Sequence, residues 1–167
     1  MEKRTKRTAK NIKETAKIAG IFLEKILKKG NFGKGAVVVC LSGDLGVGKT
    51  ALVKEVARHL GIKRKIQSPT FVIVKKYAIR PPRSDKSRST PPSQGERYKF
   101  LFHIDAYRLK NEKELSHLGW GKIIGNKDHL VFLEWPENVR KIIPSHAKRI
   151  FISVKNEKGH RNFELKK

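Results

Sequence analysis

The chain has 167 residues, enough for a single domain over residues 1–167 with a self-supporting core, and its one cysteine fits a reducing compartment without a disulfide framework. With 39 Lys and Arg against 15 Asp and Glu, the net charge of +24 permits a polyanionic partner such as RNA, or simply reflects a lysine-rich surface. No apolar run approaches the roughly 18 residues of a membrane span, and no hydrophobic segment follows the basic N-terminus. We expect a cytoplasmic protein without membrane contact; a mitochondrial presequence is the less favoured alternative.

The first predicted element is an amphipathic helix over residues 11–30. Asn11 and Glu14 have the spacing of a capping pair, and Gly30 is expected to end the helix. Its predicted apolar face consists of Ile12, Ala16, Ala19, Leu23, Ile26 and Leu27.

A predicted strand, loop and helix follow. The run GAVVVCLSGD (35–44) is apolar and β-branched, typical of a buried strand, with Cys40 as a small buried hydrophobe. In GDLGVGKT, Gly43 and Gly48 are separated by four residues and followed by Lys49 and Thr50, the phosphate-loop pattern. The glycines let backbone N–H groups turn toward an anion at the positive end of the next helix. A glycine-rich turn without a ligand is the alternative.

The helix after the loop is predicted from KTALVKEVARHLG (49–61). Leu52, Val53, Val56 and Leu60 share one face, and Gly61 is expected at the C-terminal end. The order strand, loop, helix is the context that a phosphate loop requires. Lys49 would then reach the β- and γ-phosphates, and the Thr50 hydroxyl would bind Mg²⁺.

Two further strands, FVIVKKYAI (71–79) and YKFLFHID (98–105), are predicted to form a long hairpin around a basic segment rich in Pro and Ser, residues 80–97. That segment is interpreted as a flexible loop, either disordered or a basic arm that contacts RNA or protein. Ser68 and Thr70, in QSPTF, suit a switch-like loop that senses the γ-phosphate, although a simple turn explains them equally well.

The C-terminal part predicts a short helix from Asn111 to Gly119, a buried strand HLVFLEW (129–135), a helical turn opened by Pro136, and a closing hairpin over residues 149–165. The six histidines are scattered without zinc-ligand spacing, so each is interpreted as a surface or packing residue.

Two carboxylates end apolar strands, where a rigid backbone can aim them at phosphates: Asp105 after FLFHI and Glu134 after LVFL. One would bind Mg²⁺, directly or through water, and the other would position the attacking water or assist proton transfer. Capping a strand end or pairing with a lysine is the structural alternative for either one.

The segments GDLGVGKT, SPTF, HIDAYRL, ELSHLG and LEWPE, in this order, resemble the TsaE family, small P-loop ATPases of bacterial tRNA threonylcarbamoyladenosine synthesis. The resemblance runs from about Asn11 to Leu165 and leaves out the basic segment. It implies an α/β, P-loop NTPase-type three-layer fold with a central mixed β-sheet flanked by helices. It also implies an ATPase that uses ATP and Mg²⁺ and works with TsaD and TsaB, which place a threonylcarbamoyl group on N6 of adenosine 37, so that tRNA is reached through the complex.

The resemblance also implies site residues. Lys49, Asp105 and Glu134 would be catalytic, with Asp105 beside the reacting phosphate and Glu134 binding Mg²⁺ together with Thr50. Thr15 resembles a threonine near the adenine, and Arg161 a C-terminal nucleotide contact; Trp135 would be structural or interfacial. The implied nucleotide-binding residues are Thr15, Gly43, Asp44, Leu45, Gly46, Val47, Gly48, Lys49, Thr50 and Arg161.

The chain departs from the family pattern at Ala106, where the family usually has leucine, and at residues 79–97, which are longer than expected. A small P-loop kinase is the alternative enzyme, but it needs a lid with arginines, and only residues 80–97 offer one. A non-enzymatic RNA-binding protein is the third class; the intact Lys49, Thr50, Asp105 and Glu134 argue against it. Because no arginine finger is identifiable, we expect slow hydrolysis by the isolated chain.

Overall fold

A mixed seven-stranded sheet organises the computed structural model, which describes residues 4–28, 35–79 and 98–166. The order in the sheet is β1-β7-β6-β2-β5-β4-β3. Strands β6, β2, β5 and β4 run parallel, and antiparallel pairs extend both edges. The strands are β1 (Thr5–Ala9), β2 (Val37–Ser42), β3 (Val74–Ala78), β4 (Phe100–Asp105), β5 (His129–Glu134), β6 (Lys148–Val154) and β7 (Arg161–Lys166).

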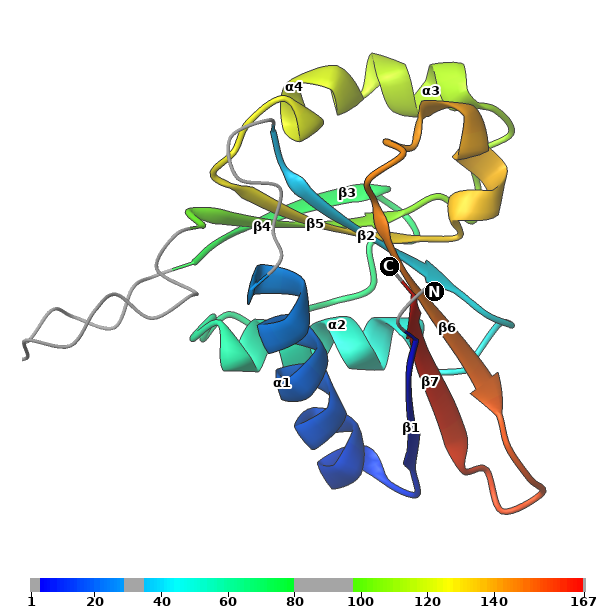
Figure 1. Ribbon diagram of the computed structural model, residues 1–167. Helices are drawn as coiled ribbons and strands as arrows, with labels where there is room; N and C mark the ends of the chain where they lie inside the picture. Colours follow the sequence, from blue (N-terminus) through cyan, green and yellow to red (C-terminus); the bar gives the residue numbers. More distant parts are fainter. Residues whose placement is uncertain (1–3, 29–34, 80–97, 167) are drawn as a thin grey trace, which may run out of the picture.

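Helices cover both faces of the sheet, which makes three layers (Figure 1). One face carries α1 (Ile12–Lys28) and α2 (Lys49–His59). The other carries α3 (Glu112–His117), α4 (Trp120–Ile124) and the 3-10 helix η2 (Pro136–Ile142). The predicted α/β fold with a mixed sheet flanked by helices is therefore confirmed.

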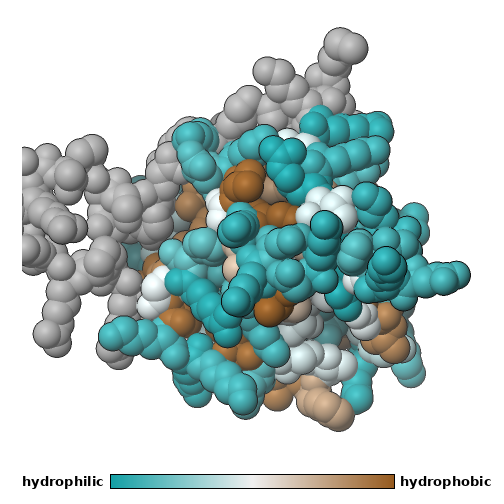
Figure 2. Space-filling model, turned by 90° about the horizontal axis from the view of Figure 1, so that it is seen from below, coloured by the Kyte–Doolittle hydropathy of each residue, from teal (hydrophilic) through white to brown (hydrophobic). Residues whose placement is uncertain are grey.

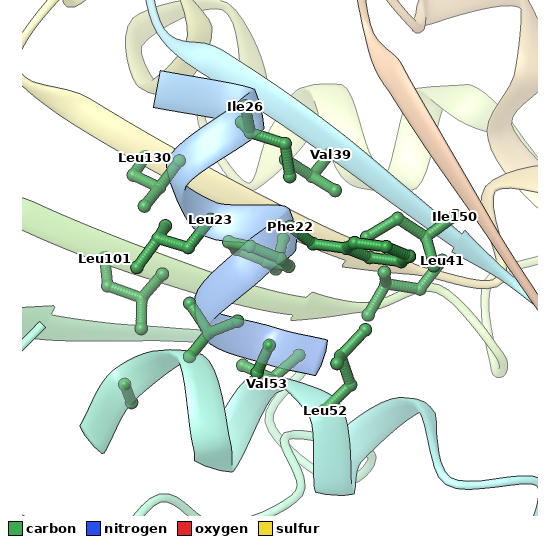
Figure 3. Close-up of a cluster of buried hydrophobic side chains, with 14 of the residues drawn as sticks. Phe22, Leu23, Ile26, Val39, Leu41, Leu52, Val53, Leu101, Leu130 and Ile150 are labelled. Carbon is green, nitrogen blue, oxygen red and sulfur yellow. The ribbon is translucent and has the colours of Figure 1, made fainter. Parts of the chain in front are cut away.

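The core is divided by the sheet into two apolar clusters. Side chains alternate along β2, so Val39 and Leu41 face α1 and α2, while Val38 and Cys40 face α3 and η2. Figure 3 shows the first cluster, in which Phe22 of α1 lies between the two helices and the sheet. Burial on both faces explains why β2 reads as a continuous apolar run.

The predicted helix at residues 11–30 is confirmed over Ile12–Lys28, but one residue of its apolar face was wrong. Asn11 Oδ1 accepts the Glu14 N–H at 3.0 Å, as a capping residue does. Ile12 is 54% exposed, because the first turn of α1 lies far from the central strands (Figure 1). Gly30 lies outside the described residues. The buried face consists of Thr15, Ile18, Ala19, Phe22, Leu23, Ile26 and Leu27.

The predicted hairpin is confirmed as the antiparallel pair β3 and β4, but β3 begins later than expected. The backbone carbonyl of Pro69 accepts the N–H groups of Val72 and Ile73, at 2.9 and 2.6 Å, and closes a turn. Phe71 and Val72 are consequently exposed, although their apolar character suggested a strand. The segment 80–97, predicted to be a loop, lies outside the described residues.

The helix after the phosphate loop is confirmed as α2, with its predicted apolar side chains buried and Gly61 in the left-handed region at φ 72°. The C-terminal hairpin is confirmed as β6 and β7. Two elements were not predicted: β1, a polar strand on the edge beside β7, and α4.

The surface on the side of α1 and α2 is largely hydrophilic, with scattered apolar residues (Figure 2). Within the described residues, no helix combines the length and apolar character needed to cross a bilayer.

Candidate functional site

The phosphate loop joins β2 to α2 at the centre of the sheet. Gly43 and Gly48 have φ angles of 144° and 110°, which favour glycine. A Cβ on Gly43 would lie 2.3 Å from the backbone carbonyl oxygen of Ile152, so this position has no room for a side chain. Glycine at position 43 is thus required by the close approach of β6 as well as by the positive φ of the loop.

Lys49, the first residue of α2, folds back over this loop. Its Nζ donates to the carbonyl oxygens of Gly43 and Asp44 at 2.6 and 2.9 Å and lies 3.9 Å from the ring centroid of Trp135. Burial lowers the pKa of the Lys49 ammonium, while the nearby carboxylates of Glu134 and Asp105 act in the opposite direction. The ammonium is thus held by weak neutral partners, which an incoming anion could replace.

Asp105 and Glu134 lie side by side, because the parallel strands β4 and β5 pair them in register. Both side chains are buried. Asp105 Oδ2 accepts the Thr70 hydroxyl at 2.6 Å. Glu134 Oε1 accepts the Thr50 hydroxyl at 2.8 Å and lies 2.6 Å from His103 Nε2.

These groups surround a cavity of about 250 Å³ at the carboxyl ends of the central strands. Ligands of parallel α/β sheets commonly bind at such an edge. The lining residues are Leu45, Gly46, Gly48, Lys49, Thr50, Ser68, Thr70, Asp105, Tyr107, Glu134 and Trp135.

Not every predicted site residue lines this cavity. Gly43, Asp44 and Val47 belong to the loop without lining the cavity. Thr15 lies in the first turn of α1, where its hydroxyl donates to the Asn11 carbonyl at 3.2 Å. Arg161 reaches from β7 to the outside of the loop, and its Nε donates to the Val47 carbonyl at 2.8 Å, so it supports the loop backbone.

The residues present fit a nucleotide with Mg²⁺. Thr50 and Glu134 bring a hydroxyl and a carboxylate oxygen within 2.8 Å of each other, and oxygen is the donor that Mg²⁺ prefers. The described residues contain no group of three or more His, Cys, Asp or Glu side chains suited to a metal. Mg²⁺ does not require one beside a nucleotide, because phosphates and water supply its remaining ligands.

The chain is similar to known proteins over most of its length. The family model for the threonylcarbamoyl adenosine biosynthesis protein TsaE matches residues 2–163. The chain belongs to the TsaE family. The TsaE resemblance noted in the sequence is thereby confirmed.

Individual TsaE relatives cover most of the chain. The tRNA threonylcarbamoyladenosine biosynthesis protein TsaE of Haemophilus influenzae is 30% identical over 78% of this chain and 70% of its own length. The protein of the same name from Rickettsia prowazekii is 30% identical over 81% of this chain and 77% of its own length. The crystal structure of Bacillus subtilis YdiB superposes with a TM-score of 0.68 at 25% identity, covering 99% of this chain and 86% of that one.

Sequence reasoning missed two residues of this TsaE-family site, and the first is His103, which was interpreted as a surface or packing histidine. It is fully buried, and its ring contacts the carboxylate of Glu134. The spacing of His103 and Asp105 could have indicated it, because residues two apart in a strand share a face. The second is Tyr107, which lines the cavity and whose ring centroid lies 5.0 Å from that of Trp135.

Proposed function

We propose that the chain is a Mg²⁺-dependent ATPase that serves as an accessory subunit in the formation of N6-threonylcarbamoyladenosine at tRNA position 37, together with TsaD and TsaB. The observation that carries the proposal is the hydrogen bond between Thr50 and Glu134, which joins the phosphate loop to the strand end beside Asp105. Membership in the TsaE family supports the tRNA pathway. Because the reaction concerns tRNA, we expect it in the cytoplasm.

The proposed chemistry divides among these residues. Loop N–H groups and the Lys49 ammonium stabilise negative charge on the phosphoryl oxygens. Thr50 and Glu134 hold Mg²⁺, which when bound neutralises charge on the phosphates. Asp105, whose Oδ2 is already hydrogen bonded to a hydroxyl, accepts a hydrogen bond from the attacking water and orients it.

Slow hydrolysis in isolation is part of the proposal. The described residues that line the cavity include no arginine, so Lys49 is the cation among them. In related phosphoryl transfers, an arginine supplied by a partner accelerates hydrolysis by about 10³–10⁵-fold. A partner that completes the site is therefore expected to raise the rate.

The mouth of the cavity supports docking of the TsaB–TsaD pair there. Leu45 and Tyr107, which line the cavity, are 73% and 46% exposed, and Phe71, which follows the lining residue Thr70 in the chain, is 83% exposed. The Arg108 guanidinium lies 4.3 Å from the Phe71 ring centroid, so the rim combines apolar surface with charge. Aromatic and arginine side chains are enriched in protein interfaces.

The test is phosphate release from ATP by the purified chain, alone and then with TsaB, TsaD and tRNA. We expect slow release alone and a clear rise with the partners, with Glu134→Ala strongly reduced in both. The alternative, a small P-loop kinase, predicts that ATP is consumed only when a small-molecule phosphoryl acceptor is added. Consumption that depends on such an acceptor would replace the ATPase proposal.

A further inference from the structure

His103 occupies a position that packing alone does not explain. It lies in the middle of β4 and is fully buried, with Lys75 of β3 and Phe132 of β5 as its register neighbours. Side chains alternate along a strand, so it lies between Leu101 and Asp105 on one face of the sheet. An aliphatic side chain such as that of Leu101 would fill this space without the cost of burying an imidazole.

The His103 imidazole is hydrogen bonded to Glu134. His103 Nε2 lies 2.6 Å from Glu134 Oε1, and an ionised carboxylate only accepts, so the ring donates its Nε2–H. The other ring nitrogen, Nδ1, is buried and has no hydrogen-bond partner within the described ranges. Buried polar atoms are normally paired, so an unpaired Nδ1 is a cost that the contact with Glu134 has to outweigh.

The same carboxylate oxygen is held from a second side. Glu134 Oε1 also accepts the Thr50 hydroxyl at 2.8 Å. Three elements meet at this oxygen, because His103 comes from β4, Glu134 from β5 and Thr50 from α2. Both contacts use Oε1, so Oε2 is the oxygen that neither group engages. Two contacts on one oxygen restrict rotation of the carboxylate before any ligand binds.

We propose that His103 is a positioning residue that holds Glu134 in the orientation in which it binds Mg²⁺ beside Thr50. The inference rests on the proposed function, because it gives His103 a part in the Mg²⁺ dependence of ATP binding. Hydrogen bonds that orient a metal ligand are typically worth about 10–100-fold in metal affinity or activity. This role accounts for an imidazole at a site where an aliphatic side chain would pack.

The test is a titration of Mg²⁺ against the binding of a fluorescent ATP analogue to the full chain, started in EDTA. In His103→Leu, the affinity in EDTA should stay within about twofold, whereas the Mg²⁺ concentration at half effect should rise about 10–100-fold. His103→Gln retains an N–H that can reach Glu134 and should recover most of that shift. If His103→Leu does not fold, His103→Met, which also lacks a donor, takes its place.

His129 provides the matched control. It is buried at the opposite end of β5, where its Nδ1 lies 2.9 Å from the Ile123 carbonyl oxygen, so His129→Leu should lower the thermal unfolding temperature without moving the Mg²⁺ midpoint. A wild-type Mg²⁺ midpoint in His103→Leu, or an equal loss of ATP affinity with and without Mg²⁺, would overturn the positioning role. If the wild-type chain does not bind ATP, or binds it without any Mg²⁺ dependence, the proposed function is wrong. The role of His103 then falls as well, because it depends on that function.

Discussion

The carboxylates at the ends of β4 and β5 are neighbours in register, yet different parts of the molecule hold them. Glu134 contacts His103 in a buried strand and Thr50 in α2, both within regular structure. Asp105 accepts hydrogen bonds from the Thr70 hydroxyl, in the loop before β3, and from the Tyr107 N–H, in the turn after β4. Regular elements fix a side chain more firmly than a surface loop does. The difference is consistent with the proposed roles, in which Glu134 is a fixed ligand of the metal and Asp105 an adjustable partner of the attacking water.

The loop that contains Thr70, the hydroxyl partner of Asp105, also has a strained backbone, at Ile73. Ile73 has a φ of 61°, which is unfavourable for a β-branched residue and typically costs about 1–3 kcal/mol. Phe71, two residues earlier, is 83% exposed. The exposed part of this loop, at Phe71, can rearrange while Ile73 stays packed against the second apolar cluster. Contact with a partner could therefore alter the Thr70–Asp105 hydrogen bond while Glu134 stays in place.

The largest effect that tests this comparison is expected from removing each carboxylate in turn. Glu134→Ala and Asp105→Ala should each reduce ATP hydrolysis by about 10²–10³-fold, because in the proposed mechanism each group acts on the reacting phosphate or its water. Only Glu134→Ala should also abolish the Mg²⁺ dependence of ATP binding. Phosphate release and binding of a fluorescent ATP analogue, with and without Mg²⁺, measure the two effects.

Lys49→Ala is the reference for these two variants, since loss of the loop ammonium should remove tight nucleotide binding whether or not Mg²⁺ is present. Equal behaviour of Glu134→Ala and Asp105→Ala in the Mg²⁺ titration would break the proposed division between a fixed and an adjustable carboxylate.

A smaller effect is expected at Thr70. Thr70→Ala removes the hydroxyl bonded to Asp105 and should slow hydrolysis about tenfold, equivalent to roughly 1.4 kcal/mol in the barrier, with ATP affinity unchanged. Thr70→Ser keeps the hydroxyl and should restore the rate. Thr8→Ala, which removes an exposed hydroxyl hydrogen bonded to Asn162, is the control. Loss of ATP affinity in Thr70→Ala would instead assign the loop to nucleotide binding.

The phosphate loop and the two strand-end carboxylates were predictable because each is specified by a short, continuous stretch of sequence. The spacing of Gly43, Gly48 and Lys49 specifies the loop within a few residues, and an apolar run ending in an acid marks a strand end. Both acids were expected to serve one nucleotide site, and the parallel register of β4 and β5 explains why they lie side by side.

The parts that were missed depend on distant contacts. The spacing of His103 and Asp105 indicates that they share a face of the strand. The contact of His103 with Glu134 crosses to the next strand, diagonal to the register partner Phe132, and is not visible along the chain. The strand β1 is polar and pairs only along β7, so it lacks the apolar alternation that predicts a strand. The exposed turn at Phe71 results from two hydrogen bonds to the Pro69 carbonyl, which override the strand preference of the apolar run.

Phe71→Ala tests whether a partner contacts the loop before β3, whose Thr70 is hydrogen bonded to Asp105. Truncating this side chain should lower the stimulation of hydrolysis by TsaB–TsaD roughly fivefold, equivalent to about 1 kcal/mol for one interface residue. Val154→Ala removes a side chain that is also exposed, at the end of β6 where it pairs with β7, and should leave the stimulation unchanged. Equal loss of stimulation in both variants would show that the partner does not use the Asp105 side of the site.

The smallest effect is expected at Cys40, which tests the rigidity of the strands beside Glu134. Cys40 lies in β2, paired with Leu133 of β5, and is fully buried. Burial raises the pKa of its thiol from 9.0 to about 12, so at pH 8 the reactive thiolate is about 10³-fold scarcer than for an exposed thiol. A thiol reagent should therefore label almost none of the folded chain, with or without ATP and Mg²⁺, and label it readily in denaturant. Rapid labelling of the folded chain would mean that the central strands open, and Glu134 would then be no more firmly held than Asp105.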